Sequence, residues 1–262
     1  MPTSAGPDIV QNGLVLELDA ADRNSYPGTG TTWFDLSGNN RNFTLTNGPT
    51  FQNIGGGSFR FDGTNDYATL NIATDNPMKI ENFIYANHTY EVWFYLTTFT
   101  PSLTDNTETV QSLITWPGYH NGIFFLRTSP TGSVSIIDNH LWNSPLNYAF
   151  GTEIVLTGSN ANTVTTGSWY CIHDIINYST TQSLTYINGV NINTRNEVPT
   201  SSMTSAQGTP ANTINIGAAR ITSTYTWLLQ NGNLSSIKLY NRALSATEIQ
   251  QNYNAQKSRF GL

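Results

Sequence analysis

Alternating hydrophobic and polar positions predict strands along this chain, most clearly in the stretch from Trp169 to Ile192. Between Trp169 and Tyr178 both alternating sets of side chains are largely apolar, which favours a central strand buried on both faces. Leu184 to Ile187 then leads through Asn188-Gly189 into Val190 to Ile192. Asn and Gly tolerate positive φ and therefore suit the two-residue turn of a hairpin. We predict paired strands here.

Short segments of the same kind follow one another along most of the chain. Leucines alternate with more polar residues from Gly13 to Asp19, as in a strand buried on one side, and His88 to Phe99 is rich in aromatic residues, as strands often are. Further short strands are predicted at Phe43–Leu45, Ser58–Phe61, Tyr67–Ile72, Ser112–Trp116, Gly122–Arg127, Ser133–Asp138, Thr152–Thr157, Thr213–Gly217 and Leu234–Tyr240. Many short strands separated by turn residues predict an all-β sandwich or barrel.

One helix is predicted, from about Ala246 to Lys257. Ser245 and Glu248 form the S-x-x-E pattern of a capping box, in which each side chain satisfies the other residue's free backbone N–H. Leu244 and Ile249 are spaced as a hydrophobic staple that would fix the entry of the chain into the helix. We expect this helix to dock on the sheets.

Three segments are predicted to lack regular structure. Residues 1–11 contain two prolines and a glycine without periodicity, so we expect an arm that becomes ordered only on a partner, and a single domain over residues 12–262. Ala20 to Asn42 is rich in turn-forming residues around Trp33 and Phe34, which predicts a long loop pinned by these two aromatics. The last six residues, 257–262, are expected to form a tail.

Composition narrows the classes of function. Charged residues make up 11% of the chain, well under the roughly one quarter of an ordinary soluble domain, so we expect a neutral surface rich in hydroxyl and amide groups. A net charge of −6 with three lysines leaves no basic stripe for nucleic acid. No apolar run is long enough to span a bilayer, and residues 1–11 lack the features of a secretory signal, so we expect a chain made in a cytoplasm with no membrane partner.

Cys171 is the only cysteine. It excludes an intrachain disulfide and a zinc site built from cysteines, and a buried thiol is the expected state.

Several motifs together resemble one known family. Gly232–Asn254 resembles the closing strand and helix of laminin-G-like domains in the concanavalin A-like lectin and glucanase superfamily. F-D-G-T-N-D-Y-A, T-Y-E-V-W-F-Y, L-T-Y-I-N-G and I-N-I-G, which begin at Phe61, Thr89, Leu184 and Ile214, fall in the order that this family shows. The resemblance covers nearly the whole chain. It implies a jelly-roll sandwich of two antiparallel sheets with one short C-terminal helix.

Two terminal segments, Gly13–Asn39 and Tyr253–Leu262, are similar to laminin-G-like structural proteins of tailed bacteriophages. This similarity implies a non-enzymatic virion protein: a capsid decoration, fibre, collar or tail component, exposed on the particle surface. Its expected partners are other virion proteins and further copies of itself, in a multicopy arrangement or a homo-oligomer, and it would adhere to host-surface glycans. The alternatives are a freestanding carbohydrate-binding lectin and a degenerate glycan hydrolase.

Paired carboxylates are the candidate catalytic groups, because retaining glycan hydrolases need two of them about 5–5.5 Å apart. The nearest pattern is E-L-D-A-A-D, which places Glu17, Asp19 and Asp22 at the end of the first predicted strand rather than in a central one. We interpret Asp19 and Asp22 as loop caps and predict no catalytic residue.

Oxygen ligands for calcium lie close together between Asp62 and Asp66. Laminin-G-like relatives often hold calcium with an acidic residue and loop carbonyls, for which Asp62, Asn65 and Asp66 would be the ligands. The same residues are typical of a turn, which is the interpretation we prefer, so we predict neither a metal nor another cofactor. The four histidines show no metal-ligand spacing, and His173 is expected to be a hydrogen-bonded core side chain.

Aromatic residues in loops are the candidate glycan ligands, since sugar rings stack on Trp and Tyr while Asn and His bond hydroxyl groups. Two such loops, 116–121 and 138–143, have this composition. The candidate ligand-binding residues are Trp116, Tyr119, His120, Asn139, His140 and Trp142. The alternative is that these aromatics pin long loops or face a protein neighbour.

Overall fold

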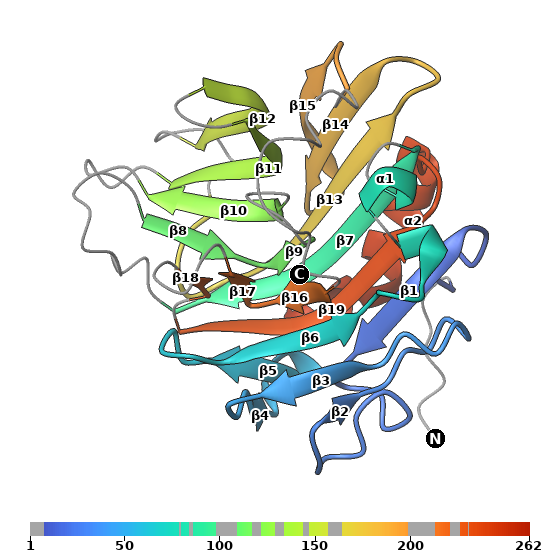
Figure 1. Cartoon of the computed structure of the whole chain (residues 1–262). Coiled ribbons are helices and arrows are strands. Elements are labelled where there is room, and N and C mark those ends of the chain that lie inside the picture. The colour runs from blue at the N-terminus through green and yellow to red at the C-terminus, as the bar shows by residue number, and fades with distance from the viewer. Residues whose placement is uncertain are drawn as a thin grey trace.

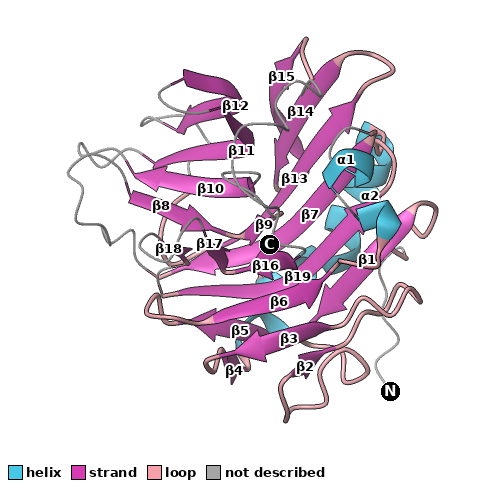
Figure 2. Ribbon diagram, viewed as in Figure 1, coloured by secondary structure: helices cyan, strands magenta, loops and turns pink. Residues whose placement is uncertain are grey.

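The computed structural model describes residues 8–78, 80–83, 86–97, 109–116, 122–128, 134–143, 147–156, 164–198, 213–220, 226–229 and 231–262. Within these ranges the chain forms two large antiparallel sheets packed as layers (Figure 1), and strands far outweigh helices (Figure 2). The sandwich predicted from the sequence is therefore confirmed. None of the helices described has both the length and the hydrophobicity to cross a bilayer.

The first sheet contains the predicted hairpin. Its strands are β1 (Leu14–Asp19), β4 (Thr50–Gln52), β5 (Ser58–Phe61), β7 (His88–Leu96), β13 (Trp169–Asn177), β14 (Gln182–Ile187), β15 (Val190–Arg195) and β19 (Gly232–Tyr240). They are ordered β15-β14-β13-β7-β19-β5-β4, and β1 also pairs with β19. Asn188 and Gly189 turn β14 into β15 with φ of 51° and 78°. β13 lies between β7 and β14, as its two apolar faces predict.

The second sheet covers the other side of the core. Its strands are β2 (Thr32–Trp33), β3 (Phe43–Thr46), β6 (Tyr67–Asn71), β8 (Thr109–Ser112), β9 (Ile114–Thr115), β10 (Gly122–Thr128), β11 (Val134–Asn143), β12 (Asn147–Leu156) and β16 (Thr213–Ile216). Their order is β12-β11-β10-β9-β16-β6-β3-β2, with β8 on β10, while β17 (Ala218–Arg220) and β18 (Thr226–Leu228) form a separate pair. The strand predicted over Ser112–Trp116 is divided at Leu113, whose carbonyl accepts a hydrogen bond from the N–H of Gly217.

The main hydrophobic core lies between the two sheets. Every second side chain of β7, including Tyr90, Val92 and Phe94, enters this core. Trp33 is fully buried in it and contacts Phe59 edge to face, with ring centroids 4.9 Å apart, so it anchors the long loop as predicted. Phe34, the residue after β2, is 39% exposed, so the prediction that it also pins the loop is wrong.

Short helices accompany the strands: α1 (Ile80–Phe83), α2 (Ala246–Gln256) and the 3₁₀ helices η1 (Ile54–Gly56), η2 (Asn76–Met78) and η4 (Lys257–Phe260). α2 is the predicted C-terminal helix. Ser245 accepts a hydrogen bond from the backbone of Glu248 while Glu248 accepts one from the backbone of Ser245, which confirms the capping box. Leu244 and Ile249 are buried in the same small cluster, which confirms the staple.

The final residues are packed rather than forming a tail. Phe260 of η4 is buried and stacks on Trp93 with ring centroids 4.0 Å apart. Gly55 allows this approach, because a Cβ at that position, where φ is 59°, would lie 2.8 Å from the Phe260 ring. A lone aromatic in a short polar segment has no periodicity, which is why the sequence did not indicate its burial.

The predicted N-terminal arm joins the domain before its expected boundary at residue 11. Val10 is buried against α2, its N–H donates to Oδ1 of Asn252 at 2.8 Å, and its carbonyl accepts from the Tyr240 hydroxyl at 3.0 Å. The described part of the arm is thus ordered by its own chain.

Replacing the cap residue, Ser245→Ala, is expected to lower the free energy of unfolding by about 1 kcal/mol, because the first turn of α2 loses a hydrogen-bond acceptor. Urea unfolding measures this loss. Ser258→Ala, at an exposed position in η4, is the matched control and should leave the stability unchanged. Equal stability of the two variants would show that the cap contributes nothing.

Candidate functional site

A row of polar side chains crosses the outer face of the first sheet. Glu17 of β1 pairs with Lys238 of β19, Lys238 pairs with Glu91 of β7, and Glu91 pairs with His173 of β13. Paired residues of antiparallel strands lie on the same face, so acidic and basic groups alternate along the row. Charged residues in otherwise apolar strands were the available sequence sign of this row, but their register could not be read from local patterns.

Glu91 is the centre of the row and is fully buried. Its carboxylate accepts hydrogen bonds from Lys238 at 3.0 Å and from His173 Nε2 at 3.1 Å. Asn252 and Gln256 of α2 each donate to it at 2.8 Å. Burial alone would raise the pKa of Glu91, but the charge of Lys238 and the hydrogen bonds from His173 and Lys238 outweigh it and hold the pKa well below its ordinary value.

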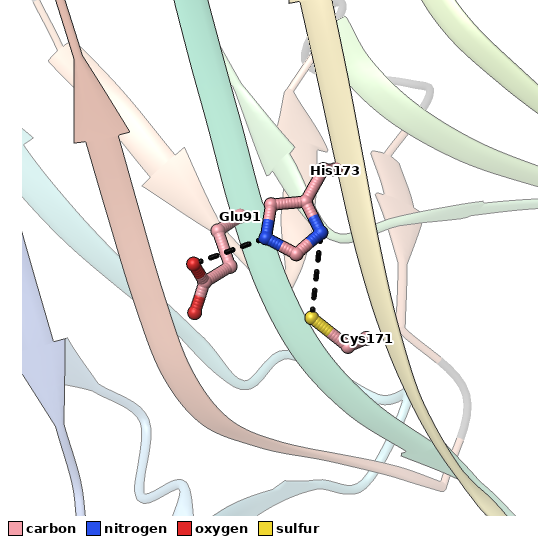
Figure 3. A group of neighbouring side chains, drawn as sticks. All are labelled: Glu91, Cys171 and His173. Carbon is pink, nitrogen blue, oxygen red and sulfur yellow. Dashed lines mark hydrogen bonds and ion pairs between the residues drawn. The ribbon is translucent and has the colours of Figure 1, made fainter. Parts of the chain in front are cut away.

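Glu91, His173 and Cys171 bring three metal-ligating residue types within 4.8 Å of one another (Figure 3). His173 uses its two ring nitrogens in different directions: Nε2 faces Glu91, and Nδ1 lies 3.6 Å from the Cys171 sulfur. The imidazole ring therefore lies between the other two ligands instead of converging with them on one point. Lys238 would also repel a cation at Glu91. The arrangement does not fit a metal centre.

Cys171, His173 and Glu91 are also in contact in the sequence thiol, base and acid, as in a catalytic triad, but the thiol is not accessible. Cys171 is fully buried beside Trp93, Trp169 and Phe260. Burial raises the pKa of the Cys171 thiol, and the charge of Glu91 raises it further, which disfavours the nucleophilic thiolate. The predictions of a buried thiol and a hydrogen-bonded core His173 are confirmed. The polar row holds α2 on the sheet.

Two of the three carboxylates considered as catalytic groups, Asp19 and Asp22, have structural partners. Asp19 accepts a hydrogen bond from the N–H of Ala21 at 2.9 Å and pairs with Arg259 at 2.7 Å. Asp22 accepts one from the N–H of Asn24 at 2.7 Å. Both are loop caps, as predicted. Burial raises the pKa of Glu17, and Lys238 opposes that shift.

The segment from Asp62 to Asp66 is a tight turn. Asp62 accepts a hydrogen bond from the N–H of Thr64 at 2.7 Å, and Asp66 accepts one from the N–H of Asp62 at 3.1 Å. The carbonyl of Asn65 is bonded to the Asn47 amide. These groups satisfy one another within the protein, which agrees with the turn interpretation.

The predicted glycan ligands are not brought together in the described residues. Trp116 is 2% exposed, stacks on Phe83 with ring centroids 5.4 Å apart and donates to the carbonyl of Met78, so its prediction as a sugar-stacking residue is wrong. An aromatic at the end of a strand has the same local sequence whether it enters the core or a binding loop.

The other five candidates remain untested predictions. Tyr119 and His120 lie outside the described residues. Asn139, His140 and Trp142 belong to strand β11, whose pairing with β12 shifts register between Asp138 and Trp142, and not to the predicted loop. The irregular pairing explains why this segment does not show the alternation of a regular strand.

His88, at the start of β7, is expected to make the protein less stable as the pH falls. Burial lowers the pKa of His88 to about 4, although the carbonyls of Ala86 and Phe83 oppose the shift. The folded pKa is below the unfolded value of about 6.5, so protonation favours unfolding between these values. From pH 7 to pH 5 we expect His88 to remove about 2 kcal/mol.

Urea unfolding of the wild type and of His88→Asn at pH 7 and pH 5 measures this contribution. Asn keeps an N–H donor for the Ala86 carbonyl, which lies 2.8 Å from His88 Nδ1. Glu91 and Glu248 have lowered pKa values and lose their contributions only below about pH 4.5, outside this window. The same pH dependence in both proteins would rule out His88 as its source.

Comparison with known proteins identifies similar sequences and folds. Residues 62–250 match the Laminin_G_3 family model, described as the concanavalin A-like lectin/glucanases superfamily. No curated protein matches the chain.

Solved structures match at low sequence identity. The binding domain of botulinum neurotoxin serotype D has 16% identity and a TM-score of 0.61, over 94% of this chain and 53% of that chain. A structure of botulinum neurotoxin type C, whose cell entry depends on interaction with two ganglioside molecules, has 14% identity and a TM-score of 0.62, over 94% and 52%. A Trypanosoma rangeli sialidase mutant with trans-sialidase activity has 15% identity and a TM-score of 0.62, over 99% and 35%. The chain thus spans a third to a half of the length of these proteins. At these sequence identities the likeness shows a shared fold alone.

Proposed function

The chain belongs to the concanavalin A-like lectin/glucanases superfamily, and from that premise we propose that it is a non-catalytic, glycan-binding protein of the tailed-phage particle surface. The observation that carries the glycan part is the family match, which spans strands of both sheets from residue 62 to residue 250. The fold is also shared with a toxin that interacts with gangliosides. Both support binding to sugars at a cell surface.

The proposal that the protein is not catalytic is supported by the surroundings of the carboxylates that were candidates for catalysis. Asp19 and Asp22 cap a loop, and Glu17 lies opposite Lys238 in the polar row. Among the described groups around the row, the Cys171 thiol is buried and its pKa is raised. Asp19 and Asp22 are held in structural contacts and Cys171 is buried, so these three groups are not placed to attack or protonate a glycosidic bond.

The phage-particle part rests on the sequence similarity of Gly13–Asn39 and Tyr253–Leu262 to phage structural proteins. These two segments meet in the structure, where Asp19 pairs with Arg259 at 2.7 Å. Two segments far apart in the sequence therefore belong to one structural unit, which supports a likeness of whole domains.

A panel of glycans tests the sugar-binding part. The wild type is expected to bind at least one immobilised glycan and to release no reducing sugar from β-glucans. Release of sugar by the wild type, and its loss in Glu17→Gln, would mean that the protein is an enzyme. A panel with no bound glycan would mean that it is not a lectin.

Mass spectrometry of purified virions tests the particle part. The protein is expected among the structural proteins of the particle, in many copies. Its absence from virions together with glycan binding would favour the freestanding lectin.

A further inference from the structure

The outer face of the second sheet carries uncharged polar side chains at neighbouring positions of three strands. The residues Leu45, Ala68, Ile214 and Ile216 of β3, β6 and β16 are buried in the core. Side chains alternate along a strand, so the positions between them face outward. The outward residues, here called the hydroxyl–amide face, are Thr44, Thr46, Tyr67, Thr69, Asn71, Thr213 and Asn215.

Strand register aligns these residues in rows. Thr44 pairs with Thr69, and Thr69 pairs with Asn215, which gives a central row across three strands. Thr46 with Tyr67 forms a second row, and Asn71 with Thr213 forms a third. Neighbouring strands lie about 4.8 Å apart, and alternate residues along a strand lie about 6.7 Å apart. The face is therefore a regular grid of hydroxyl and amide groups.

The grid carries no charge and is open to a ligand. No Asp, Glu, Lys or Arg occurs in β2, β3, β6, β9 or β16. The seven side chains are exposed or half-buried. Within the described part of the chain, Thr69, Thr213 and Asn215 have no side-chain hydrogen bond, so their polar groups are left for solvent or a ligand. The outer face of the first sheet differs, since α2 covers it.

We propose that the hydroxyl–amide face binds a neutral glycan chain that lies across β3, β6 and β16. This inference rests on the proposed glycan binding and adds the place of the site and the class of sugar. Thr hydroxyls and Asn amides both donate and accept hydrogen bonds, as sugar hydroxyls do. A pyranose unit in an extended glycan is close in length to the strand spacing of about 4.8 Å, so successive sugars meet successive strands.

Two further observations define the ligand. Tyr67 is half-buried at the side of the central row, where its ring offers a stacking surface. An acidic glycan would find no Lys or Arg on these strands to pair with its carboxylates or sulfates, which favours an uncharged one. The central row continues through backbone pairing from Asn215 to Thr115, Gly122 and His140. Thr115 is buried and its hydroxyl donates to the carbonyl of Ala218, so the open part of the row ends at Asn215.

The test compares variants that remove hydroxyl groups and keep side-chain shape. Thr44→Val with Thr69→Val deletes two hydroxyls from the central row, and Val suits a strand, so folding should be preserved. Thr50→Val, at an exposed position of β4 in the other sheet, is the matched control. The probes are soluble mixed-linkage β-glucan, dextran and mannan as neutral glycans and alginate as the acidic one. Binding is measured by affinity electrophoresis and calorimetry, and unfolding in urea confirms that each variant is folded.

We expect the wild type and Thr50→Val to bind a neutral glycan equally, and the double variant to bind it about tenfold more weakly, equivalent to about 1.4 kcal/mol. Tyr67→Ala should weaken binding similarly. Unchanged affinity in the double variant and in Tyr67→Ala would overturn the inference while leaving glycan binding intact. Binding of alginate alone would overturn the neutral ligand. No binding of any probe would overturn the inference and count against the proposed function as well.

Discussion

Replacing Lys238 by Met is expected to lower the free energy of unfolding by about 3–5 kcal/mol, the usual cost of leaving one member of a buried ion pair without its partner. Glu91 would keep its negative charge in a fully buried position, 147 residues away in the sequence and on the neighbouring strand. Asn252 and Gln256 would remain hydrogen-bonded to Glu91 but cannot neutralise it. Urea unfolding at pH 7 measures the loss.

Arg195→Met provides the matched control for a long cation on the same sheet. Arg195 lies 3.6 Å from Glu197, and the two side chains are 32% and 58% exposed. Pairs of this kind contribute about 0–1 kcal/mol. A Lys238→Met variant as stable as Arg195→Met would show that Glu91 does not depend on Lys238, either because it is neutral or hydrated or because its contact with His173 is sufficient.

Replacing Phe260 by Ala is expected to remove about 3–5 kcal/mol and to open the thiol of Cys171 to reagents. The ring of Phe260 stacks on that of Trp93, and its centroid lies 4.8 Å from the centroid of the Trp169 ring. Cys171 is buried in the same cluster as these three rings. The rate of reaction with Ellman's reagent under native conditions measures the opening, and urea unfolding measures the stability. Because the chain has a single cysteine, the signal has one source.

Leu262→Ala is the control, since Leu262 is 43% exposed and only two residues from Phe260. It should leave both the stability and the slow thiol reaction of the wild type unchanged. Rapid labelling of wild-type Cys171 would mean that η4 is detached from the sheet in solution.

Local periodicity predicted the strands well because the alternation of buried and exposed side chains in a strand depends only on residues of that strand. The alternation of β1, the Asn188-Gly189 turn and the Ser245 capping box each depend on residues within a few positions of one another. The polar row depends on something else. Glu91 and Lys238 meet only through the register of β7 with β19, which no local pattern contains.

Aromatic residues were harder to place than strands. Trp116 and Phe260 each stand at the end of an element, where composition is the same for a core residue and for a ligand-binding one. Burial of their rings depends on Phe83 and Trp93, which lie far from them in the sequence. The hydroxyl–amide face was missed for the same reason, because Thr and Asn become a grid only when β3, β6 and β16 are side by side.

The position of β19 in the sheet determines when the first sheet can close during synthesis. β19 is the shared neighbour of β1, β5 and β7, yet it is made after all of them. Until Gly232–Tyr240 has left the ribosome, the edge of β7 that faces it has no strand to pair with, and open strand edges are where chains associate wrongly. Translation that stops before this strand is therefore expected to give aggregation-prone products that require chaperones. In the finished chain β19 pairs between β7 and β5 and completes the sheet.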